Sequence, residues 1–254
     1  MSKLNKAVFI TVRTGSKRLP NKALIEIKNK TTIEHLIQRV KKSKLADKII
    51  LCTTELPEDD ILCEIAERNG ILFFRGSTSD KLERWRGSCN KFDIDFFVTA
   101  DGDDLFCEPE LIDLAFNQYE ESSRQIDFLK SDDVICGAFT YGIKTEALDR
   151  VCEVKDTDDT EMMWVYFTET GLFNVQELSN IPEIYLRDDI RMTLDYEDDL
   201  KFFTNIIEHF GDDKFTLKNI VKYLDNNDEV RYINYYLHEQ WSNNQKNKIK
   251  LVLK

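Results

Sequence analysis

Hydrophobic and polar positions follow two different periods that take turns along the first half of the chain. Short apolar runs rich in β-branched and aromatic residues predict buried strands, and segments with apolar residues every three or four positions predict helices. Thr31, for example, precedes apolar residues at 33, 36, 37 and 40, as expected of a capped helix. The alternation predicts βαβ units around a largely parallel sheet, the α/β class. The predicted strands are 8–12, 48–53, 71–74 and 96–100, and the predicted helices are 31–40, 57–66, 80–89 and one that opens at 109–113.

The second half of the chain is less regular. We find no internal repeat and no low-complexity linker, which predicts a single domain over residues 1–240. Within it, residues 125–185 are expected to form an excursion toward a second substrate or a second subunit. Residues 241–254 are expected to form a polar tail that is mobile at 243–248, with the apolar residues 251–253 able to dock on the protein. The pattern predicts strands at 135–143 and 191–194, helices at 144–151, 197–210 and 216–224, and an acidic loop at 153–161.

Composition narrows the class of protein. A chain of 254 residues that is 42% hydrophobic and 32% charged fits one sizeable globular domain. No apolar run approaches the ~20 residues that span a bilayer, and residues 1–6 hold no signal-peptide core, so we expect a cytoplasmic protein with no membrane partner. The net charge of −12 argues against nucleic acid as a partner. The six cysteines, which form no Cys-x-x-Cys pair, are expected to be reduced and mostly buried, and His35, His209 and His238 to be structural or at the surface.

A basic loop directly follows the first predicted strand. Backbone N–H groups in a Gly-Ser turn donate to phosphate oxygens, and guanidinium and ammonium groups neutralise the phosphate charge. The loop therefore predicts a polyphosphate site, although it matches neither the Walker loop nor the three-glycine dinucleotide fingerprint. The alternative is a basic surface turn after an edge strand. The loop contains Arg13, Gly15, Ser16, Lys17, Arg18 and Lys22.

An acidic turn follows the fourth predicted strand. Asp101, Asp103 and Asp104 stand within four residues, where their charges repel one another unless a cation is bound or they face water. In open α/β sheets, ligands bind at the carboxyl ends of strands. Mg²⁺ takes one or two carboxylates together with water and substrate phosphates, which suits a triphosphate site. A solvated acidic turn is the alternative.

These segments resemble the cytidylyltransferases that activate acidic sugars with CTP, which include the octulosonate and acylneuraminate enzymes and an SpsF-like branch. The family pattern Arg-x-Gly-Ser-x-Arg-Leu-Pro-x-Lys is met at residues 13–22. Its Gly-Asp-x-Pro-Leu-Ile-x-Pro-Glu segment lies over 102–110, with Leu105 in place of a proline. Its Arg-Leu-Thr-Val-Asp-Thr-Pro-Glu-Asp-Leu segment lies over 191–200, with Glu197 in place of a proline. A weaker SpsF-like match, Phe-Arg-Gly-Ser, occupies 74–77.

The resemblance implies a three-layer, GT-A-like and Rossmann-like nucleotidyltransferase fold and a set of site residues. Asp103 and Asp195 take the positions that bind Mg²⁺, and Arg13 and Lys22 hold the β- and γ-phosphates; these four are the catalytic candidates. Taken alone, Asp195 also fits a helix N-cap, and residues 77–84 fit a helix cap with a solvated face. The further nucleotide-binding candidates are Thr14, Gly15, Ser16, Arg18 and Asp101, with Arg75, Gly76 and Ser77 beside the base.

The expected reaction is transfer of CMP from CTP to an acidic sugar or related hydroxylated acceptor, with release of pyrophosphate, for surface polysaccharide or glycan synthesis. The resemblance implies a homodimer. One alternative is a metal-dependent glycosyltransferase, since Asp101-Gly102-Asp103 is an Asp-x-Asp motif, although such an enzyme needs no cationic loop. A non-catalytic nucleotide-binding protein is another, because two family prolines are missing. The acceptor stays open: the acidic 153–161 loop would contact hydroxyls or ammonium groups, or belong to a dimer arm.

Overall fold

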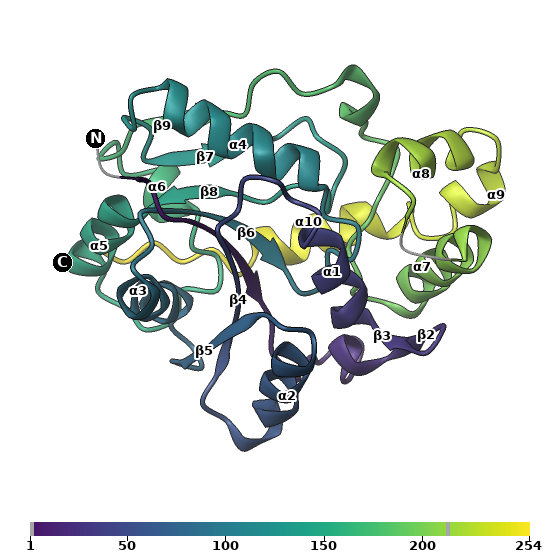
Figure 1. Cartoon of the computed structure of the whole chain (residues 1–254), viewed down its shortest axis with the longest axis horizontal. Coiled ribbons are helices and arrows are strands. Elements are labelled where there is room, and N and C mark those ends of the chain that lie inside the picture. Colours follow the sequence, from purple (N-terminus) through teal and green to yellow (C-terminus); the bar gives the residue numbers. More distant parts are fainter. Residues whose placement is uncertain (1–2, 212–213) are drawn as a thin grey trace.

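A computed structural model describes residues 3–211 and 214–254, and Figure 1 shows how their strands and helices are arranged. The strands are β1 Lys6–Thr11, β2 Glu26–Ile27, β3 Lys30–Thr31, β4 Lys48–Thr54, β5 Leu72–Gly76, β6 Phe96–Asp101, β7 Phe128–Lys130, β8 Gly142–Lys144 and β9 Val175–Glu177. The α-helices are α1 Thr32–Val40, α2 Asp60–Arg68, α3 Lys81–Phe92, α4 Pro109–Glu121, α5 Thr145–Val154, α6 Val165–Thr168, α7 Glu197–Phe210, α8 Leu217–Leu224, α9 Asp228–Arg231 and α10 Leu237–Lys246. The 3₁₀ helices are η1 Lys22–Leu24, η2 Pro57–Asp59 and η3 Glu183–Tyr185.

The central sheet of the described residues has seven strands in the order β5-β4-β1-β6-β8-β7-β9. Strands β5, β4, β1 and β6 run parallel, as right-handed βαβ units require. Strand β8 pairs antiparallel with β6 and β7, and β9 pairs parallel with β7. The predicted α/β class with a mostly parallel sheet is confirmed.

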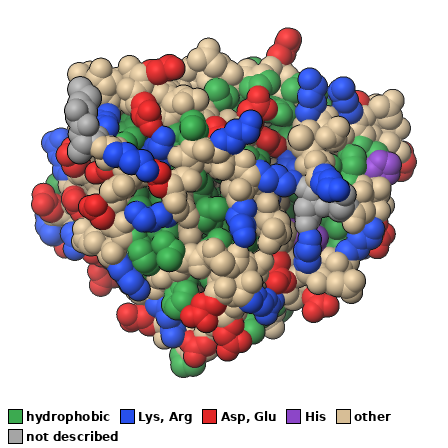
Figure 2. Space-filling view, viewed as in Figure 1, with side chains coloured by type: hydrophobic (Ala, Val, Ile, Leu, Met, Phe, Trp, Pro, Cys, Tyr) green, Lys and Arg blue, Asp and Glu red, His purple; other side chains and the backbone are tan. Residues whose placement is uncertain are grey.

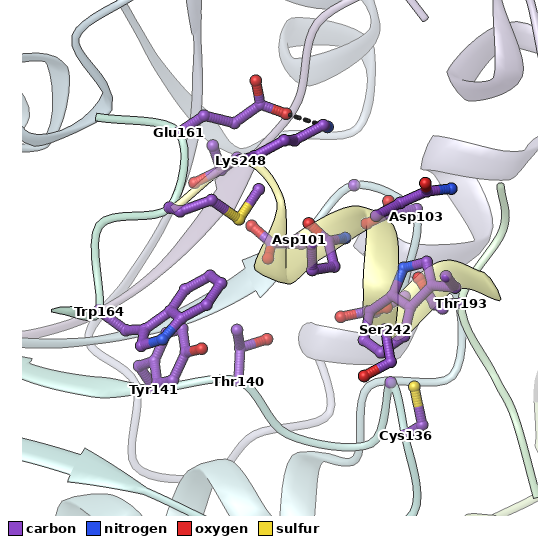
Figure 3. A pocket seen from close by; sticks show the side chains of 18 of the residues that line it. Asp101, Asp103, Cys136, Thr140, Tyr141, Glu161, Trp164, Thr193, Ser242 and Lys248 are labelled. Atoms are coloured by element: carbon purple, nitrogen blue, oxygen red, sulfur yellow. Dashed lines mark hydrogen bonds and ion pairs between the residues drawn. The ribbon is translucent and has the colours of Figure 1, made fainter. Parts of the chain in front are cut away.

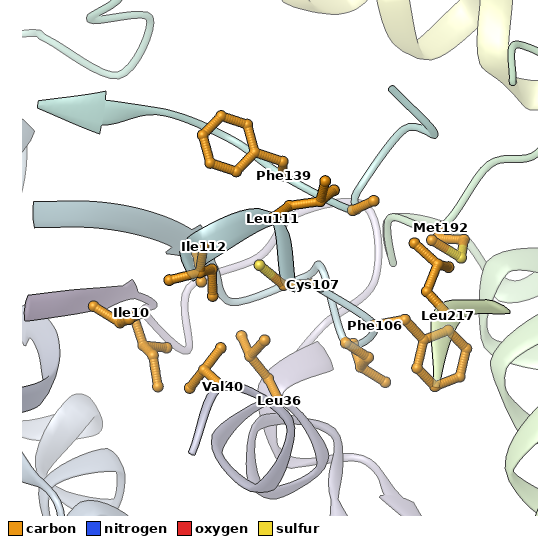
Figure 4. Packing of buried hydrophobic residues seen from close by; sticks show 14 of the residues in the cluster. Ile10, Leu36, Val40, Phe106, Cys107, Leu111, Ile112, Phe139, Met192 and Leu217 are labelled. Atoms are coloured by element: carbon orange, nitrogen blue, oxygen red, sulfur yellow. The ribbon is translucent and has the colours of Figure 1, made fainter. Parts of the chain in front are cut away.

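Side chains of each central strand alternate between two helical layers. In β1, Val8 and Ile10 face a layer that contains α1, α2, α4, α7 and α8, whereas Ala7 and Phe9 face α3, α5 and α6. Strands buried on both faces show continuous apolar runs, which explains why the parallel strands were readable from sequence. Figure 4 shows the first layer, where side chains of β1, α1, α4 and α8 pack together.

The helices of the first half begin where the sequence places their caps. Thr31 and Glu34 form a capping box at α1, and the Asp80 carboxylate accepts a hydrogen bond from the Glu83 backbone N–H at α3 (3.1 Å). Pro109 occupies the first turn of α4, where its missing N–H costs nothing. These local signals fix the helix positions within a few residues of the prediction.

Two predicted strands of the second half are wrong. Only the end of 135–143 joins the sheet, as β8, because the chain turns at Gly137 (φ 86°), where a Cβ would lie 2.0 Å from the Met192 carbonyl oxygen. Residues 191–194 are extended but pair with loops: the Met192 N–H donates to the Cys136 carbonyl (2.9 Å), and the Leu194 N–H to the Asp103 carbonyl (2.8 Å). Strands β7 and β9 were not predicted.

The C-terminal residues form more regular structure than the polar composition of 243–248 predicts, and the apolar end docks as the sequence allows. Residues up to Lys246 continue helix α10, and Leu253 pairs antiparallel with Lys155. Trp241 lies over the Arg191 guanidinium, with 5.0 Å to the ring centroid. The segment is therefore held by packing at one end and by backbone pairing at the other. The division of the chain into one domain with an excursion at 125–185 stays a prediction.

The surface and the cysteines complete the description. Figure 2 shows acidic and basic side chains intermingled over one face of the molecule. All six cysteines are free thiols, and five of them are buried, Cys136 being half-buried. Among residues 3–211 and 214–254, no helix combines the length and the apolar character that crossing a membrane requires.

Candidate active site

A cleft of about 1430 Å³ opens at the carboxyl ends of β1 and β6. The basic loop after β1 and residues 101–104 after β6 line one part of it, and residues 131–141, 161–164 and helix α10 line the rest. Figure 3 shows Tyr141 and Trp164 on one side of this space and Asp103 and Ser242 on the other, with Asp101 between them. The sheet order explains the arrangement, because β6 lies between β1 and β8.

The basic loop is anchored by a carboxylate that the sequence did not indicate. The Thr14 backbone N–H and hydroxyl both donate to the same oxygen of Asp59, at 2.8 and 2.7 Å, and Thr14 is buried. Ser16 and Gly15 stand at the tip of the loop, where a Cβ on Gly15 would meet nothing within 4 Å. The loop is therefore held at its base by Asp59 and by a turn in which the Ser16 N–H donates to the Thr14 carbonyl (2.7 Å), and it is exposed at Gly15.

Two cations of the loop converge on the two predicted metal carboxylates. The Lys22 Nζ lies 2.7 Å from Asp103 Oδ2 and 2.8 Å from Asp195 Oδ1. An Arg18 guanidinium nitrogen lies 2.6 Å from the same Asp195 oxygen. Arg13 lies apart from this cluster: it donates to the Thr78 carbonyl (3.3 Å) and faces Glu161 at 3.6 Å. Residues 18, 22, 103 and 195, which are far apart in the sequence, thus meet at one place.

Backbone contacts position both carboxylates. Gly102 packs against β1, where a Cβ would lie 2.7 Å from Val12 and where its N–H donates to the Thr11 carbonyl (2.9 Å). The close approach requires glycine at this position, and it places Asp103 beside the basic loop. The Asp195 N–H donates to Asp199 at 2.8 Å, so the start of α7 fixes the second carboxylate.

The surroundings shift the pKa values of the two carboxylates in opposite directions. Burial raises the pKa of Asp103 above its usual range, although Lys22 opposes the effect. Burial acts on Asp195 in the same direction, but Lys22, Arg18 and Arg191 outweigh it and lower its pKa. The Lys22 ammonium is disfavoured by burial, yet the two carboxylates raise its pKa. At neutral pH the cluster therefore holds a charged lysine and an ionised Asp195.

The other two carboxylates of the acidic turn point elsewhere. Asp101 pairs with Lys81 at 3.1 Å. Asp104 is buried, and burial together with Asp103 and Asp101 raises its pKa well above the usual range. Repulsion within the turn is therefore relieved by two lysines, Lys81 at Asp101 and Lys22 at Asp103, and the raised pKa of Asp104 favours its neutral form.

The base-side candidates are not brought to the cleft. Arg75 donates to the carbonyls of Thr54 and Leu56, both at 3.1 Å, and pairs with Asp60. The Ser77 hydroxyl accepts from the Asp80 N–H (3.0 Å). Gly76 lies where a Cβ would be 2.9 Å from the Phe74 ring, so it serves close packing. Their neighbours in the chain, Thr78, Ser79, Lys81 and Arg84, line the cleft instead.

The donor set fits a magnesium ion that shares its ligands with a substrate. Asp195 Oδ2 is buried and has no hydrogen-bond partner, and an Arg191 nitrogen lies 3.8 Å from it. The described residues contain no group of three or more His, Cys, Asp or Glu side chains placed to hold a metal alone. Two carboxylates, Asp103 and Asp195, are what Mg²⁺ takes when phosphates and water complete its shell.

Sequence reasoning missed the layer beneath Asp195. Arg191 is fully buried, and its Nε and Nη2 lie 3.1 and 3.3 Å from the two Asp199 oxygens. The Asn234 amide donates to Asp199 (2.8 Å) and to the Arg191 carbonyl (3.1 Å). The motif at 191–200 contained Arg191 and Asp199, but nothing in it indicated a partner at position 234.

The far side of the cleft is built from the second half of the chain. Tyr141 and Trp164 stack with ring centroids 6.4 Å apart (Figure 3). Lys248, beyond α10, pairs with Glu161 at 3.0 Å. The acidic 153–161 loop is thus tied to the C-terminal segment across the cleft.

Comparison with known proteins identifies the family. The family model described as "Cytidylyltransferase" matches residues 7–199, well over half of the chain. The chain belongs to this cytidylyltransferase family. The cytidylyltransferase is 32% identical over 228 residues to an uncharacterised protein of Methanocaldococcus jannaschii, covering 89% of this chain and 93% of that one. It is 25% identical over 215 residues to the spore coat polysaccharide biosynthesis protein SpsF of Bacillus subtilis, with 82% and 89% covered.

Two further comparisons support the predicted resemblance. The cytidylyltransferase is 26% identical over 120 residues to the 3-deoxy-manno-octulosonate cytidylyltransferase of an Anaeromyxobacter species, covering 46% of this chain and 48% of that one. Its fold matches the structure of a cytidylyltransferase from Leptospira borgpetersenii with a TM-score of 0.82 at 23% identity, over 90% and 97% of the two chains. The predicted fold family and the nucleotidyltransferase class are confirmed, which decides against the glycosyltransferase and the non-catalytic alternative.

Proposed function

We propose that this cytidylyltransferase transfers CMP from CTP to an acidic sugar or a related hydroxylated acceptor and releases pyrophosphate. The observation that carries the proposal is the meeting of the loop after β1 with Asp103 and Asp195 at one edge of the sheet. Likeness to SpsF and to octulosonate enzymes supports a sugar acceptor and a role in the synthesis of a surface polysaccharide or glycan. A homodimer is proposed from the family resemblance.

The sheet order suggests where the two substrates lie. The triphosphate would lie over the loop after β1, and the acceptor over the β8 side, beside Tyr141 and Trp164. Asp103, after β6, stands between these two places. This arrangement suits an in-line attack of an acceptor hydroxyl on the α-phosphorus, with pyrophosphate leaving on the opposite side. The protein contributes by positioning the reactants and stabilising charge.

Each named side chain has a defined part in this proposal. Arg13 and Lys22 would neutralise the β- and γ-phosphates and the departing pyrophosphate. Asp103 and Asp195 would hold Mg²⁺. When bound there, the ion would supply neutralising charge and lower the pKa of the attacking hydroxyl.

Pyrophosphate release tests the proposal. The protein is incubated with each of the four nucleoside triphosphates and with a panel of octulosonic, nonulosonic and neutral sugars, and pyrophosphate is measured by a coupled phosphatase assay. We expect release with CTP and only when an acceptor is present. Release with a different nucleotide would overturn the choice of CTP, and release confined to neutral sugars would overturn the acidic acceptor.

A further inference from the structure

Lys22 lies in the place between two carboxylates that the proposed function gives to a metal ion. Its ammonium bonds to one oxygen of Asp103 and one of Asp195, at 2.7 and 2.8 Å, and its side chain is only 16% exposed. The Lys22 carbonyl accepts a hydrogen bond from the Thr32 hydroxyl, which fixes the backbone at this residue.

The charges of this cluster are already balanced without a metal ion. Asp103 and Asp195 carry two negative charges, and Lys22 together with Arg18 supplies two positive charges. A divalent cation added to this arrangement would leave an excess of positive charge in a largely buried place, which is unfavourable. A metal ion can therefore enter easily only when the two side chains leave the carboxylates.

We propose that Lys22, assisted by Arg18, exchanges partners during binding. In the nucleotide-free protein Lys22 holds Asp103 and Asp195; when the metal and the triphosphate enter, Lys22 moves to the phosphates and the carboxylates bind the metal. This inference rests on the proposed function for the identity of the metal and the triphosphate. It implies that the metal alone binds weakly and that metal and triphosphate each raise the affinity for the other by the same factor.

The chemistry of the side chain suits this role. A lysine ammonium is a compact charge on a flexible four-carbon stem, so it can reach either set of oxygens without the planar fit that a guanidinium needs. Arg13, the other cation assigned to the phosphates, contacts Thr78 and Glu161 and neither metal carboxylate. Only one of the two phosphate-binding candidates therefore competes with the metal.

The test is titration of Mn²⁺ into the nucleotide-free protein. Binding is measured by calorimetry and, independently, by the spin-resonance signal of the Mn²⁺ that stays free. Lys22→Met is compared with Lys22→Arg, which keeps the charge, and with Lys81→Met. Lys81 is the matched control because it pairs with Asp101 in the same cleft and with neither proposed ligand. We expect Lys22→Met to bind Mn²⁺ about ten-fold more tightly or better, and Lys22→Arg and Lys81→Met to stay within about three-fold of the parent.

A double variant shows where the additional Mn²⁺ affinity of Lys22→Met arises. Lys22→Met combined with Asp195→Asn should lose the added Mn²⁺ affinity if the ion sits between the two carboxylates. Thermal melting without and with Mn²⁺ provides a second readout: Lys22→Met should melt at lower temperature than the parent and recover with Mn²⁺. Equal or weaker Mn²⁺ binding by folded Lys22→Met, or an equal gain in Lys81→Met, would overturn the exchange. Neither measurement contains CTP or an acceptor, so it fails or succeeds independently of CMP transfer.

Discussion

Asp195 meets cations on two sides, and the two sides differ in origin and exposure. On the cleft side, Lys22 and Arg18 come from the loop after β1 and are 16% and 28% exposed. On the inner side, Arg191 comes from the same segment as Asp195 and is fully buried. It is held by Asp199 and covered by the Trp241 ring.

This difference indicates that the cations on the cleft side can exchange partners, whereas Arg191 has a structural role. The cleft-side cations reach solvent and have a second set of partners available in a triphosphate. Arg191 has no such alternative, and removing it would leave the buried Asp199 carboxylate without its counter-ion, which costs far more than an exposed pair. A site that must change partners needs one side that moves and one side that does not.

The largest expected effect comes from removing one of the two carboxylate charges that Lys22 contacts. Asp103→Asn and Asp195→Asn each keep the shape of the side chain and remove one metal-directed charge. We expect turnover to fall by about a hundred-fold or more, because a lost metal ligand costs several kcal/mol. Steady-state rates at saturating Mg²⁺ and circular dichroism measure activity and fold.

The matched control for this prediction is Asp93→Asn, the same substitution at an exposed carboxylate outside the cleft, which should behave as the parent. A variant at position 103 or 195 that keeps more than about a tenth of the parent rate would contradict its role at the metal.

Replacing Arg191, on the inner side of Asp195, should lower the stability of the protein more than its catalytic rate. Arg191→Met removes the cation and leaves Asp199 and Asp195 buried without it, so we expect the free energy of unfolding to fall by about 3–5 kcal/mol. Urea denaturation measures this change. Arg68→Met is the comparison, because Arg68 is half exposed and pairs with Glu34 at the surface, where a pair contributes about 0–1 kcal/mol. Equal losses in the two variants would show that the inner side is not structural.

The sequence predicted the cleft side of this comparison well. The cations at 13–22 and the carboxylate at 103 directly follow apolar runs, and parallel strands bring their carboxyl ends to one edge. Both signals are local, so they survive without knowledge of tertiary contacts. Asp195 was assigned from the family resemblance, because taken alone it also fits a helix N-cap, and the extended segment before it pairs with loops and not with a strand.

The inner side was beyond sequence reasoning because its contacts join distant segments. Asn234 reaches Asp199 across 35 positions, and Thr14 reaches Asp59 across 45. Neither asparagine nor aspartate at such positions differs in pattern from an ordinary cap or surface residue. The polar composition of α10 likewise concealed a helix whose one aromatic ring, Trp241, covers a buried guanidinium.

Arg13 provides a smaller and more selective test of the cleft side. If Arg13 grips the β- and γ-phosphates, Arg13→Ala should weaken CTP binding by about ten-fold or more, since a hydrogen bond to a charged group contributes about 1.5–3 kcal/mol. CMP, which lacks those phosphates, should bind almost as well as to the parent. Calorimetric titration of both nucleotides measures the difference.

Arg18→Ala is the informative comparison for this test, because Arg18 bonds to Asp195 and not to the part of the loop around Arg13. A parallel fall in CTP and CMP affinity for Arg13→Ala, with a lower melting temperature, would point to a structural role for the loop.

The smallest expected effect on nucleotide binding is at Arg75, which the resemblance places beside the base and the structure directs toward Thr54, Leu56 and Asp60. Arg75→Ala should leave CTP affinity within about two-fold of the parent, and its lost bonds should lower stability by about 1 kcal/mol. Asp60→Asn separates the exposed ion pair from the two carbonyl bonds and should cost less. The Thr54 and Leu56 carbonyls directly precede η2, and η2 contains Asp59, which holds Thr14. Loosening of this turn in Arg75→Ala would therefore affect nucleotide binding only indirectly, through Thr14. A ten-fold loss of CTP affinity with unchanged stability would therefore mean that Arg75 turns toward the base when CTP binds, and that the exchange of partners extends beyond Lys22.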